Sequence, residues 1–301
     1  MQVLLKSDKL YPELLGEIYQ APAQLYVAGD LPNLPMIAIV GSRKPTPYGE
    51  MVAYKISADL ARAGFCIVSG LAYGIDSIVH RAALESNGKT VAVLGSGLEN
   101  IYPTKHRPLA REIIRSGGAI ISEYPAATPP LKHHFPARNR IIAGLAQATI
   151  VPEADAKSGS LITAQLALDE NRLVFAVPGP ITSARSSGPN NLLKAGASVI
   201  TSAADVCAIL GSNSPEKEQT ILSTKELSQN AQIILRSLQN NPATTDDLST
   251  STKLAISELL STLTLLEMQN FVRSTHGNTW ISTITIWQNK ALPRTIGELD
   301  I

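Results

Sequence analysis

The stretch MIAIVGSRKPTPYGEMVAYKISADLARAGFCIVSGLAYG, residues 36–74, decides the fold of this chain. It contains two short runs, 36–40 and 66–69, that are mostly apolar and rich in β-branched residues. Such runs are typical of strands buried on both faces of a parallel sheet. Residues 48–63 between them have a helical pattern, so the stretch predicts a strand–helix–strand unit.

The same alternation continues to about residue 200. Strands alternating with helices predict an α/β fold with a doubly wound, mostly parallel sheet over residues 36–210. The further apolar runs lie at 90–94, 119–122, 148–151, 173–177 and 197–200. The helical patterns between them lie at 76–87, 104–116, 135–145, 160–171 and 190–195.

The segments that flank this domain have other patterns. Residues 1–35 contain four prolines and little periodicity, which predicts an extension packed on the main domain. Residues 211–227 are polar and indicate a linker, whereas 228–283 predict a small winged-helix domain. Residues 284–301 form a tail without a clear pattern. The expected elements of the small domain are helices at 228–239, 244–250 and 253–266 and strands at 271–274 and 279–283, around a His-Gly-Asn turn.

The composition excludes several classes of protein. Of the 301 residues 44% are hydrophobic and only 17% charged, which excludes a highly charged disordered chain. The net charge of +1 identifies no partner. Cys66 and Cys207 are too few for a disulfide framework or a cysteine zinc site. No stretch is long and apolar enough for a transmembrane helix and no signal peptide is visible, so we expect a cytoplasmic protein without membrane contact.

Several predicted strands end in glycine-rich loops. Residues 41–43 (Gly-Ser-Arg), 69–70 (Ser-Gly) and 95–97 (Gly-Ser-Gly) follow the first three strands, and 158–160 (Ser-Gly-Ser) open a later helix. The carboxyl ends of parallel strands meet at one edge of the sheet, so these loops predict a shared anion-binding edge. None has the GxGxxG or Walker pattern, so no nucleotide cofactor is expected. The alternative is purely structural, with tight turns and helix caps.

The strongest local signal is positive charge at residues 105–140. Seven Lys or Arg stand there against two Glu, a net charge of +5. Within it, residues 132–140 (KHHFPARNR) combine cations, an amide and an aromatic ring, the groups that hold single-stranded nucleic acid. A solvated charged face is the alternative interpretation. Adjacent His133 and His134 point apart and lack a carboxylate cluster, so no metal is expected.

Seven ordered blocks of the sequence carry a resemblance to a known family. They are VGSRKPTPYG (40–49), SGLAYGIDSIVHRAAL (69–84), VLGSGLENIYPTKHRPL (93–109), ISEYP (121–125), HFPARNRIIAGLA (134–146), KSGSLITAQLALDENRLVFAVPG (157–179) and GPNNLLKAGA (188–197). These blocks resemble the DNA-processing protein A family, also called DprA or Smf. The resemblance is strong over about residues 10–210 and moderate over 228–283.

The resemblance implies an extended Rossmann-like domain that binds and protects incoming single-stranded DNA without cutting it. It also implies that the protein loads the RecA recombinase on those strands during natural transformation and forms a homodimer, with no catalysis and no cofactor. By motif, Arg43 and Lys132 would hold the DNA in a pocket and Phe135 would stack on a base. The residues expected around them are Ser42, Gly70, Arg138, Asn139, Arg140, Ser158, Gly159 and Ser160.

Two features depart from the family pattern. Many relatives carry an N-terminal domain of the sterile-alpha-motif type, and we do not expect one here because the match begins at about residue 11. Residues 211–301 hold seven Lys or Arg and nine Asp or Glu, a net charge of −2. A winged helix that binds duplex DNA strongly is usually basic, so we expect this domain to contact protein or to play a weak auxiliary role.

Two other functions are considered beside single-strand binding. A nucleotide-processing enzyme of the phosphoribohydrolase type would need a PGGxGTxxE-like loop with a catalytic carboxylate, and the nearest loops, 158–160 and 178–180, lack that Glu. An adaptor acting only through the winged helix would leave the basic and glycine-rich loops without a role. In the favoured interpretation, the dimer and recombinase surfaces are expected within about residues 160–210.

Overall fold

The computed structural model describes residues 1–212, 227–239, 241–269, 271–275 and 278–282. The chain divides into two compact units, Met1–Glu218 and Gln219–Ile301. Most of the expected linker and the whole expected tail lie outside the described residues.

The first unit is built on one sheet, with nine strands among residues 1–212. Their order is β1-β2-β6-β5-β4-β3-β7-β8-β9, and from β6 to β9 all neighbours are parallel. All seven strands predicted between residues 36 and 200 are present, which confirms the mostly parallel α/β fold. They are β3 (Met36–Ile39), β4 (Cys66–Ser69), β5 (Thr90–Val93), β6 (Ala119–Ser122), β7 (Ala148–Val151), β8 (Leu173–Ala176) and β9 (Ser198–Val199).

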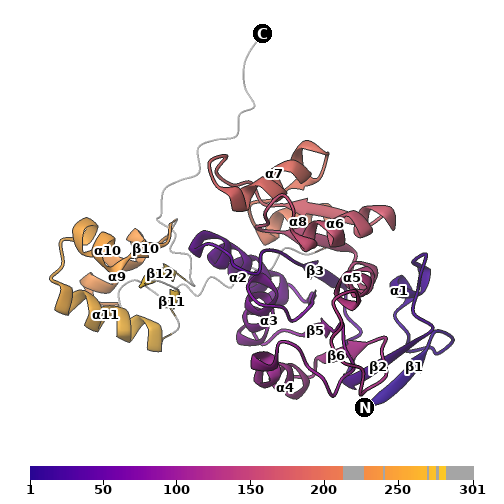
Figure 1. Ribbon diagram of the computed structural model, residues 1–301. Helices are drawn as coiled ribbons and strands as arrows, with labels where there is room; N and C mark the ends of the chain where they lie inside the picture. The colour runs from indigo at the N-terminus through magenta and orange to yellow at the C-terminus, as the bar shows by residue number, and fades with distance from the viewer. Residues whose placement is uncertain (213–226, 240, 270, 276–277, 283–301) are drawn as a thin grey trace, which may run out of the picture. The chain divides into compact units, whose positions relative to one another are not determined.

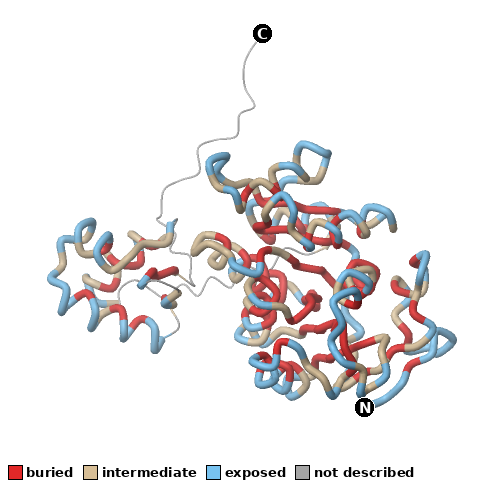
Figure 2. Tube along the Cα trace, in the orientation of Figure 1, coloured by how far each residue is buried: buried red, intermediate tan, exposed pale blue. Residues whose placement is uncertain are grey.

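Two apolar layers, one on each face, hold the sheet. On β3, Ile37 and Ile39 face one layer and Ala38 faces the other, because successive side chains of a strand point to opposite faces. Every residue of β3 to β7 is buried (Figure 2), which explains why these strands are apolar at both alternating positions.

The helices cover the sheet from both sides (Figure 1). One face carries α2 (Pro47–Arg62), α3 (Ile75–Glu85), α4 (Arg107–Arg115) and α8 (Ala203–Leu210). The other carries α1 (Glu13–Glu17), α5 (His134–Leu145) and α6 (Gly159–Asp169), while α7 (Ser187–Lys194) packs on β8. Two short 3₁₀ turns, Thr104–His106 and Ala184–Ser186, precede α4 and α7.

The strand order reverses between β3 and β7, which lie side by side although residues 40–147 separate them in the chain. From β3 the chain winds outward through β4, β5 and β6, then returns to β7 and winds the other way. In doubly wound sheets, the loops at the carboxyl ends of the two strands at such a reversal diverge to opposite faces and leave a crevice. The site described below lies there.

The N-terminal segment forms more structure than its prolines predict. β1 (Gln2–Leu5) and β2 (Gln24–Gly29) pair antiparallel, and β2 pairs antiparallel with β6, so this segment extends the sheet itself. In β2, Leu25 and Val27 are buried while Gln24 and Tyr26 are half-buried. This alternation is too short to be recognised as a strand in the sequence.

Helix α8 was not predicted from the sequence, although its capping signal is present. The Ser202 hydroxyl accepts from the Asp205 backbone N–H at 3.4 Å, and the Asp205 carboxylate accepts from the Ser202 N–H at 2.9 Å. This reciprocal pair is a capping box.

The second unit is a winged helix, as predicted. Its core joins Ile234, Leu248, Leu263 and Trp280 from its helices and its small sheet. Its third helix contains no Lys or Arg. Residues 276–277 of the expected turn lie outside the described residues. The elements are α9 (Gln229–Ser237), β10 (Ala243–Thr244), α10 (Thr245–Thr252), α11 (Ile256–Met268), β11 (Val272–Thr275) and β12 (Thr279–Ser282).

A buried histidine makes the stability of the first unit depend on pH. His80 on α3 is fully buried, and its Nδ1 lies 2.7 Å from the Thr90 hydroxyl. That hydroxyl donates its own proton to the Ile67 carbonyl at 2.6 Å, so Nδ1–H must be the donor and Nε2 carries no proton. Burial, followed by the positive charges of His106 and Arg138, lowers the pKa of His80 to about 3.

We expect acid to weaken the first unit through His80. Because the folded-state pKa lies below the unfolded value of about 6.5, the stabilisation is complete above about pH 6.5 and is lost as the pH falls towards 3. Lowering the pH from about 7.5 to about 5.5 should cost about 1.4 kcal/mol through this group. Urea unfolding followed by far-UV circular dichroism should show a smaller pH dependence in His80→Gln, and an equal dependence would refute the assignment.

Candidate nucleic-acid interface

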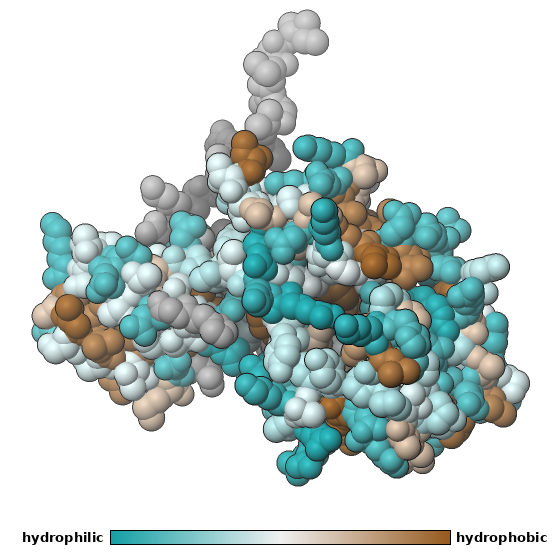
Figure 3. Space-filling model, in the orientation of Figure 1, coloured by the Kyte–Doolittle hydropathy of each residue, from teal (hydrophilic) through white to brown (hydrophobic). Residues whose placement is uncertain are grey.

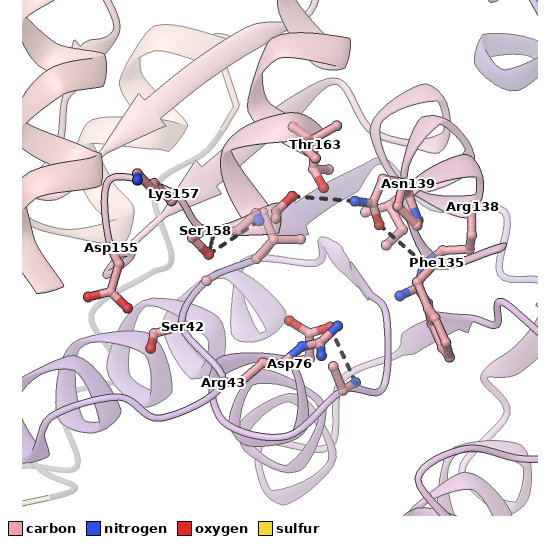
Figure 4. Close-up of a pocket in the computed structure, with 18 of the residues that line it drawn as sticks. Ser42, Arg43, Asp76, Phe135, Arg138, Asn139, Asp155, Lys157, Ser158 and Thr163 are labelled. Carbon is pink, nitrogen blue, oxygen red and sulfur yellow. Dashed lines mark hydrogen bonds between the residues drawn. The ribbon is translucent and has the colours of Figure 1, made fainter. Parts of the chain in front are cut away.

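A pocket of about 860 Å³ opens where the strand order reverses. Three segments form most of its wall: the loop after β3, the first turns of α5, and the loop from β7 into α6. Figure 4 shows Ser42, Arg43, Asn139 and Ser158 arranged around the same opening. Of the eleven residues expected to bind DNA, nine line this pocket. They are Ser42, Arg43, Lys132, Phe135, Arg138, Asn139, Ser158, Gly159 and Ser160.

The loop after β3 is tightly held at its base. A Cβ on Gly41 would lie 2.7 Å from the Glu153 carbonyl oxygen, so the close approach of the β7 loop requires glycine. Ser42 is buried; its N–H donates to that same carbonyl at 2.7 Å, and its hydroxyl accepts from the Lys44 N–H at 3.1 Å. The next residue, Arg43, is therefore presented from a fixed backbone while its side chain stays exposed.

A buried carboxylate fixes the start of α2 next to this loop. Glu153 accepts from the Thr46 N–H at 2.7 Å and from the Thr46 hydroxyl at 2.6 Å, and Thr46 is the N-cap of α2. Burial raises the pKa of Glu153, while the bonds from Thr46 oppose that shift. Glu153 is not among the residues that line the pocket, and its carboxylate holds the start of α2 in place.

The Ser-Gly-Ser loop begins α6 and opens to the pocket. Ser158 is the N-cap, and its hydroxyl accepts from the Ser160 N–H at 3.4 Å. A Cβ on Gly159 would meet nothing within 4 Å, which leaves this turn open to a ligand. Asn139 donates from Nδ2 to the Gly159 carbonyl at 3.4 Å and ties α5 to the same loop.

Two aromatic rings form the rim near the start of α5. The half-buried ring of Phe135 lies 5.6 Å from the exposed ring of Tyr102, tilted by 50°. Lys132 is exposed three residues before Phe135. His134 is buried and stacks on Tyr124 at 3.9 Å. No group of three metal-ligating side chains occurs in the part of the chain that the structure describes.

Arg138, one of the residues expected around the DNA, lines the pocket but is buried. It is 5% exposed, and its Nη1 donates to the Gly70 carbonyl at 2.8 Å and to the Val93 carbonyl. The Asp76 carboxylate accepts from the Gly70 N–H at 3.1 Å and the Ala72 N–H at 3.3 Å. Burial lowers the pKa of Arg138 to about 10, and the attraction of Asp76 opposes this shift.

Two expected residues lie outside the pocket lining. Gly70 contributes its backbone to the Asp76 and Arg138 network, and a Cβ there would lie 2.5 Å from the Arg138 guanidinium. Arg140 forms an ion pair with Glu123 at 2.5 Å, with both side chains less than one-fifth exposed. In the structure the backbone N–H and carbonyl of Gly70 and the Nη2 of Arg140 are therefore already bonded to protein groups.

The pocket is strongly positive. Six cations line it against the two carboxylates Asp76 and Asp155, among the described residues. Arg185 forms an ion pair with Asp155 at 3.4 Å and donates to the Ser42 hydroxyl at 2.5 Å and to the Lys44 carbonyl. The cations are Arg43, Lys44, Lys132, Arg138, Lys157 and Arg185.

The lining residues that the sequence prediction did not include are, among others, Lys44, Tyr102, Asp155, Lys157 and Arg185. Lys44 and Lys157 adjoin predicted loops and could have been included on that ground. Arg185 follows β8, whose carboxyl end lies at the same edge, so its position was also a usable signal. No helix in the described part of the chain is long and apolar enough to cross a membrane.

Comparison with known proteins identifies relatives of both units. The family model of DNA recombination-mediator protein A matches residues 2–211, and that of the DprA winged helix domain matches residues 218–278. The chain is 46% identical over 197 residues to protein Smf of Escherichia coli K12, covering 65% of this chain and 53% of that protein. It is 46% identical over 203 residues to DNA processing protein DprA of Streptococcus pneumoniae R6, covering 67% and 71%. The match spans about half the length of the E. coli relative.

Solved structures agree with these matches. The crystal structure of DprA from Streptococcus pneumoniae superposes with a TM-score of 0.66 at 44% identity, covering 69% of this chain and 73% of that one. The solved structure of DNA processing protein A from Helicobacter pylori superposes with a TM-score of 0.61 at 35% identity, covering 66% of this chain and 92% of that one. The fold, the motif blocks and the family matches over both units agree, and the chain belongs to the DNA recombination-mediator protein A (DprA) family.

Proposed function

We propose that the pocket binds single-stranded DNA. The observation that carries the proposal is a set of exposed cations, Arg43, Lys132 and Lys157, beside the Phe135–Tyr102 ring pair. None of the three cations has an ion pair or hydrogen bond among the described residues, so each is available to a phosphate. Cations that follow the backbone and rings that stack on bases are the means by which proteins hold single strands without sequence preference.

The relatives support this proposal. The Helicobacter pylori structure is described by its single-stranded DNA-binding mode, and this chain covers 92% of it. On that basis we further propose that the protein protects incoming single strands during natural transformation, loads RecA recombinase on them, and acts as a homodimer. Filament assembly by RecA on strands already bound by this protein would test the loading step; inhibition instead of acceleration would contradict it.

The pocket geometry favours binding over catalysis. The Asp76 carboxylate is occupied by two backbone N–H groups, and Asp155 is paired with Arg185. The Ser158 and Ser160 hydroxyls bond to each other at 2.8 Å and have no histidine within hydrogen-bond reach among the described contacts. A hydrolase would need a carboxylate or an activated nucleophile free to reach its substrate. The phosphoribohydrolase alternative is therefore the less favoured one.

We expect Phe135→Ala to weaken binding of a single-stranded oligothymidylate by about 1–3 kcal/mol for the stacked base that is lost. Fluorescence anisotropy would measure this with single-stranded DNA, duplex DNA and a mononucleotide. Phe135→Tyr serves as the matched control, because it keeps a ring that can stack. Equal affinity for duplex and single strand would contradict the proposed function, and release of a free base from the mononucleotide would support the enzyme instead.

A further inference from the structure

A stripe of arginines on α4 has no role in the fold or in the pocket. Arg107, Arg111 and Arg115 are spaced four residues apart and all three are exposed. This spacing places them on one side of the helix, about 6 Å apart along its axis. The opposite side of α4 is buried through Leu109, Ala110 and Ile113. Figure 3 shows strongly hydrophilic side chains over the position at which Figure 1 draws α4.

The three arginines lack partners within the described residues. Three other arginines of this unit form ion pairs: Arg62 with Asp59, Arg140 with Glu123, and Arg172 with Glu17. None of the three stripe residues has an ion pair or hydrogen bond to another residue that the structure describes. Like charges four residues apart on a helix repel and destabilise it slightly. No ion pair among the described residues accounts for this spacing, so the three guanidinium groups are available to a ligand.

The start of α4 is fixed to the pocket rim. Tyr102, which lines the pocket, comes two residues before the 3₁₀ turn that leads into α4. In that turn the buried His106 donates from Nδ1 to the Leu71 carbonyl at 2.8 Å, and its ring lies 5.0 Å from that of Tyr73. Ala72, which lies between Leu71 and Tyr73 in the chain, also lines the pocket. The arginine stripe thus begins beside the aromatic rim and runs away from it.

We propose that the stripe carries the DNA strand onward from the pocket. A strand that leaves the pocket past Tyr102 runs along α4, and its successive phosphates contact Arg107, Arg111 and Arg115. This inference rests on the proposed function of the pocket. Guanidinium groups on a convex helix reach the phosphates and no base edges, so this part of the path has no sequence preference. It lengthens the bound segment and increases the salt dependence of binding.

The test compares oligothymidylates of about 6 and about 18 nucleotides, lengths chosen to fill the pocket alone or to exceed it. The variant carries Arg107→Gln, Arg111→Gln and Arg115→Gln. The charge-matched control carries Lys6→Gln, Lys9→Gln and Lys55→Gln, which are exposed lysines outside the pocket lining and outside α4. We expect the variant to bind the longer strand about tenfold more weakly, with a log–log salt slope smaller by about 2. The shorter strand should bind as before.

Every outcome of this test either supports or contradicts the proposed DNA path along α4. Unchanged affinity of the variant for the longer strand would overturn the stripe, and so would an equal loss for both strands or for the charge-matched control. Failure of the wild-type protein to bind either strand would instead overturn the proposed function of the pocket. Far-UV circular dichroism of the variant checks that exposed substitutions on α4 leave the fold intact.

Discussion

Replacing Arg138 with methionine is expected to lower the free energy of unfolding by about 3–5 kcal/mol. The guanidinium is 5% exposed and donates to the carbonyls of Gly70 and Val93. Its charge also compensates the buried carboxylate of Asp76, whose pKa is raised by burial and lowered again chiefly by Arg138. Methionine fills a similar length but leaves that carboxylate without its counter-charge and both carbonyls without the guanidinium donor.

Urea unfolding followed by far-UV circular dichroism would measure this loss, since neither tryptophan, Trp280 or Trp287, lies in the first unit. Arg138→Met combined with Asp76→Asn removes both charges and should recover part of the stability. A loss below about 1 kcal/mol would mean that Arg138 is not the counter-charge that the structure makes it. DNA binding by the Arg138 variant should fail only where the protein unfolds.

Replacing both Arg43 and Lys132 with alanine is expected to weaken single-strand binding by about 2–6 kcal/mol if the two contacts are independent. Both side chains are exposed at the pocket and have no protein partner among the described residues, so the fold does not need them. Two lost phosphate contacts should also make the log–log salt slope smaller by about 1.4.

Anisotropy titrations over a range of salt concentrations would measure both effects. Lys55→Ala is the control, because that lysine is exposed on α2 and lies outside the pocket lining. Unchanged affinity and salt slope in the double variant would show that phosphates do not enter this pocket. Unlike the Arg138 variant, this one should unfold at the same urea concentration as the wild type.

The elements of the first unit followed closely from local pattern. Strands such as β3 and β4 are buried on both faces, and such a strand must be apolar at every position. That constraint is visible in any short window of sequence. β1 and β2 were not found because they lie near the edge of the sheet, where one face is partly open and the apolar signal is weaker.

The sequence predicted most of the residues of the candidate site, but not which of its cations are exposed and which are bonded to protein groups. Arg138 and Arg140 stand two residues apart in one basic motif, and both were expected near DNA. The structure buries Arg138 against Gly70 and pairs Arg140 with Glu123. The sequence distance between these partners is 68 residues in one case and 17 in the other, so no local window contains the information.

Local sequence was sufficient for the kinds of groups at the sheet edge: glycines at strand ends, cations and an aromatic ring. The alternation of buried residues along a strand and the residues that form a turn depend on neighbours a few residues away. Both can therefore be predicted from a short stretch of sequence. Only the tertiary structure decided which cations face solvent and which are buried and bonded to protein groups. A charge can be buried only where a partner, often distant in the sequence, compensates it. The same folding left Arg43, Lys132 and the α4 arginines exposed and unpartnered, and a phosphate backbone can use them.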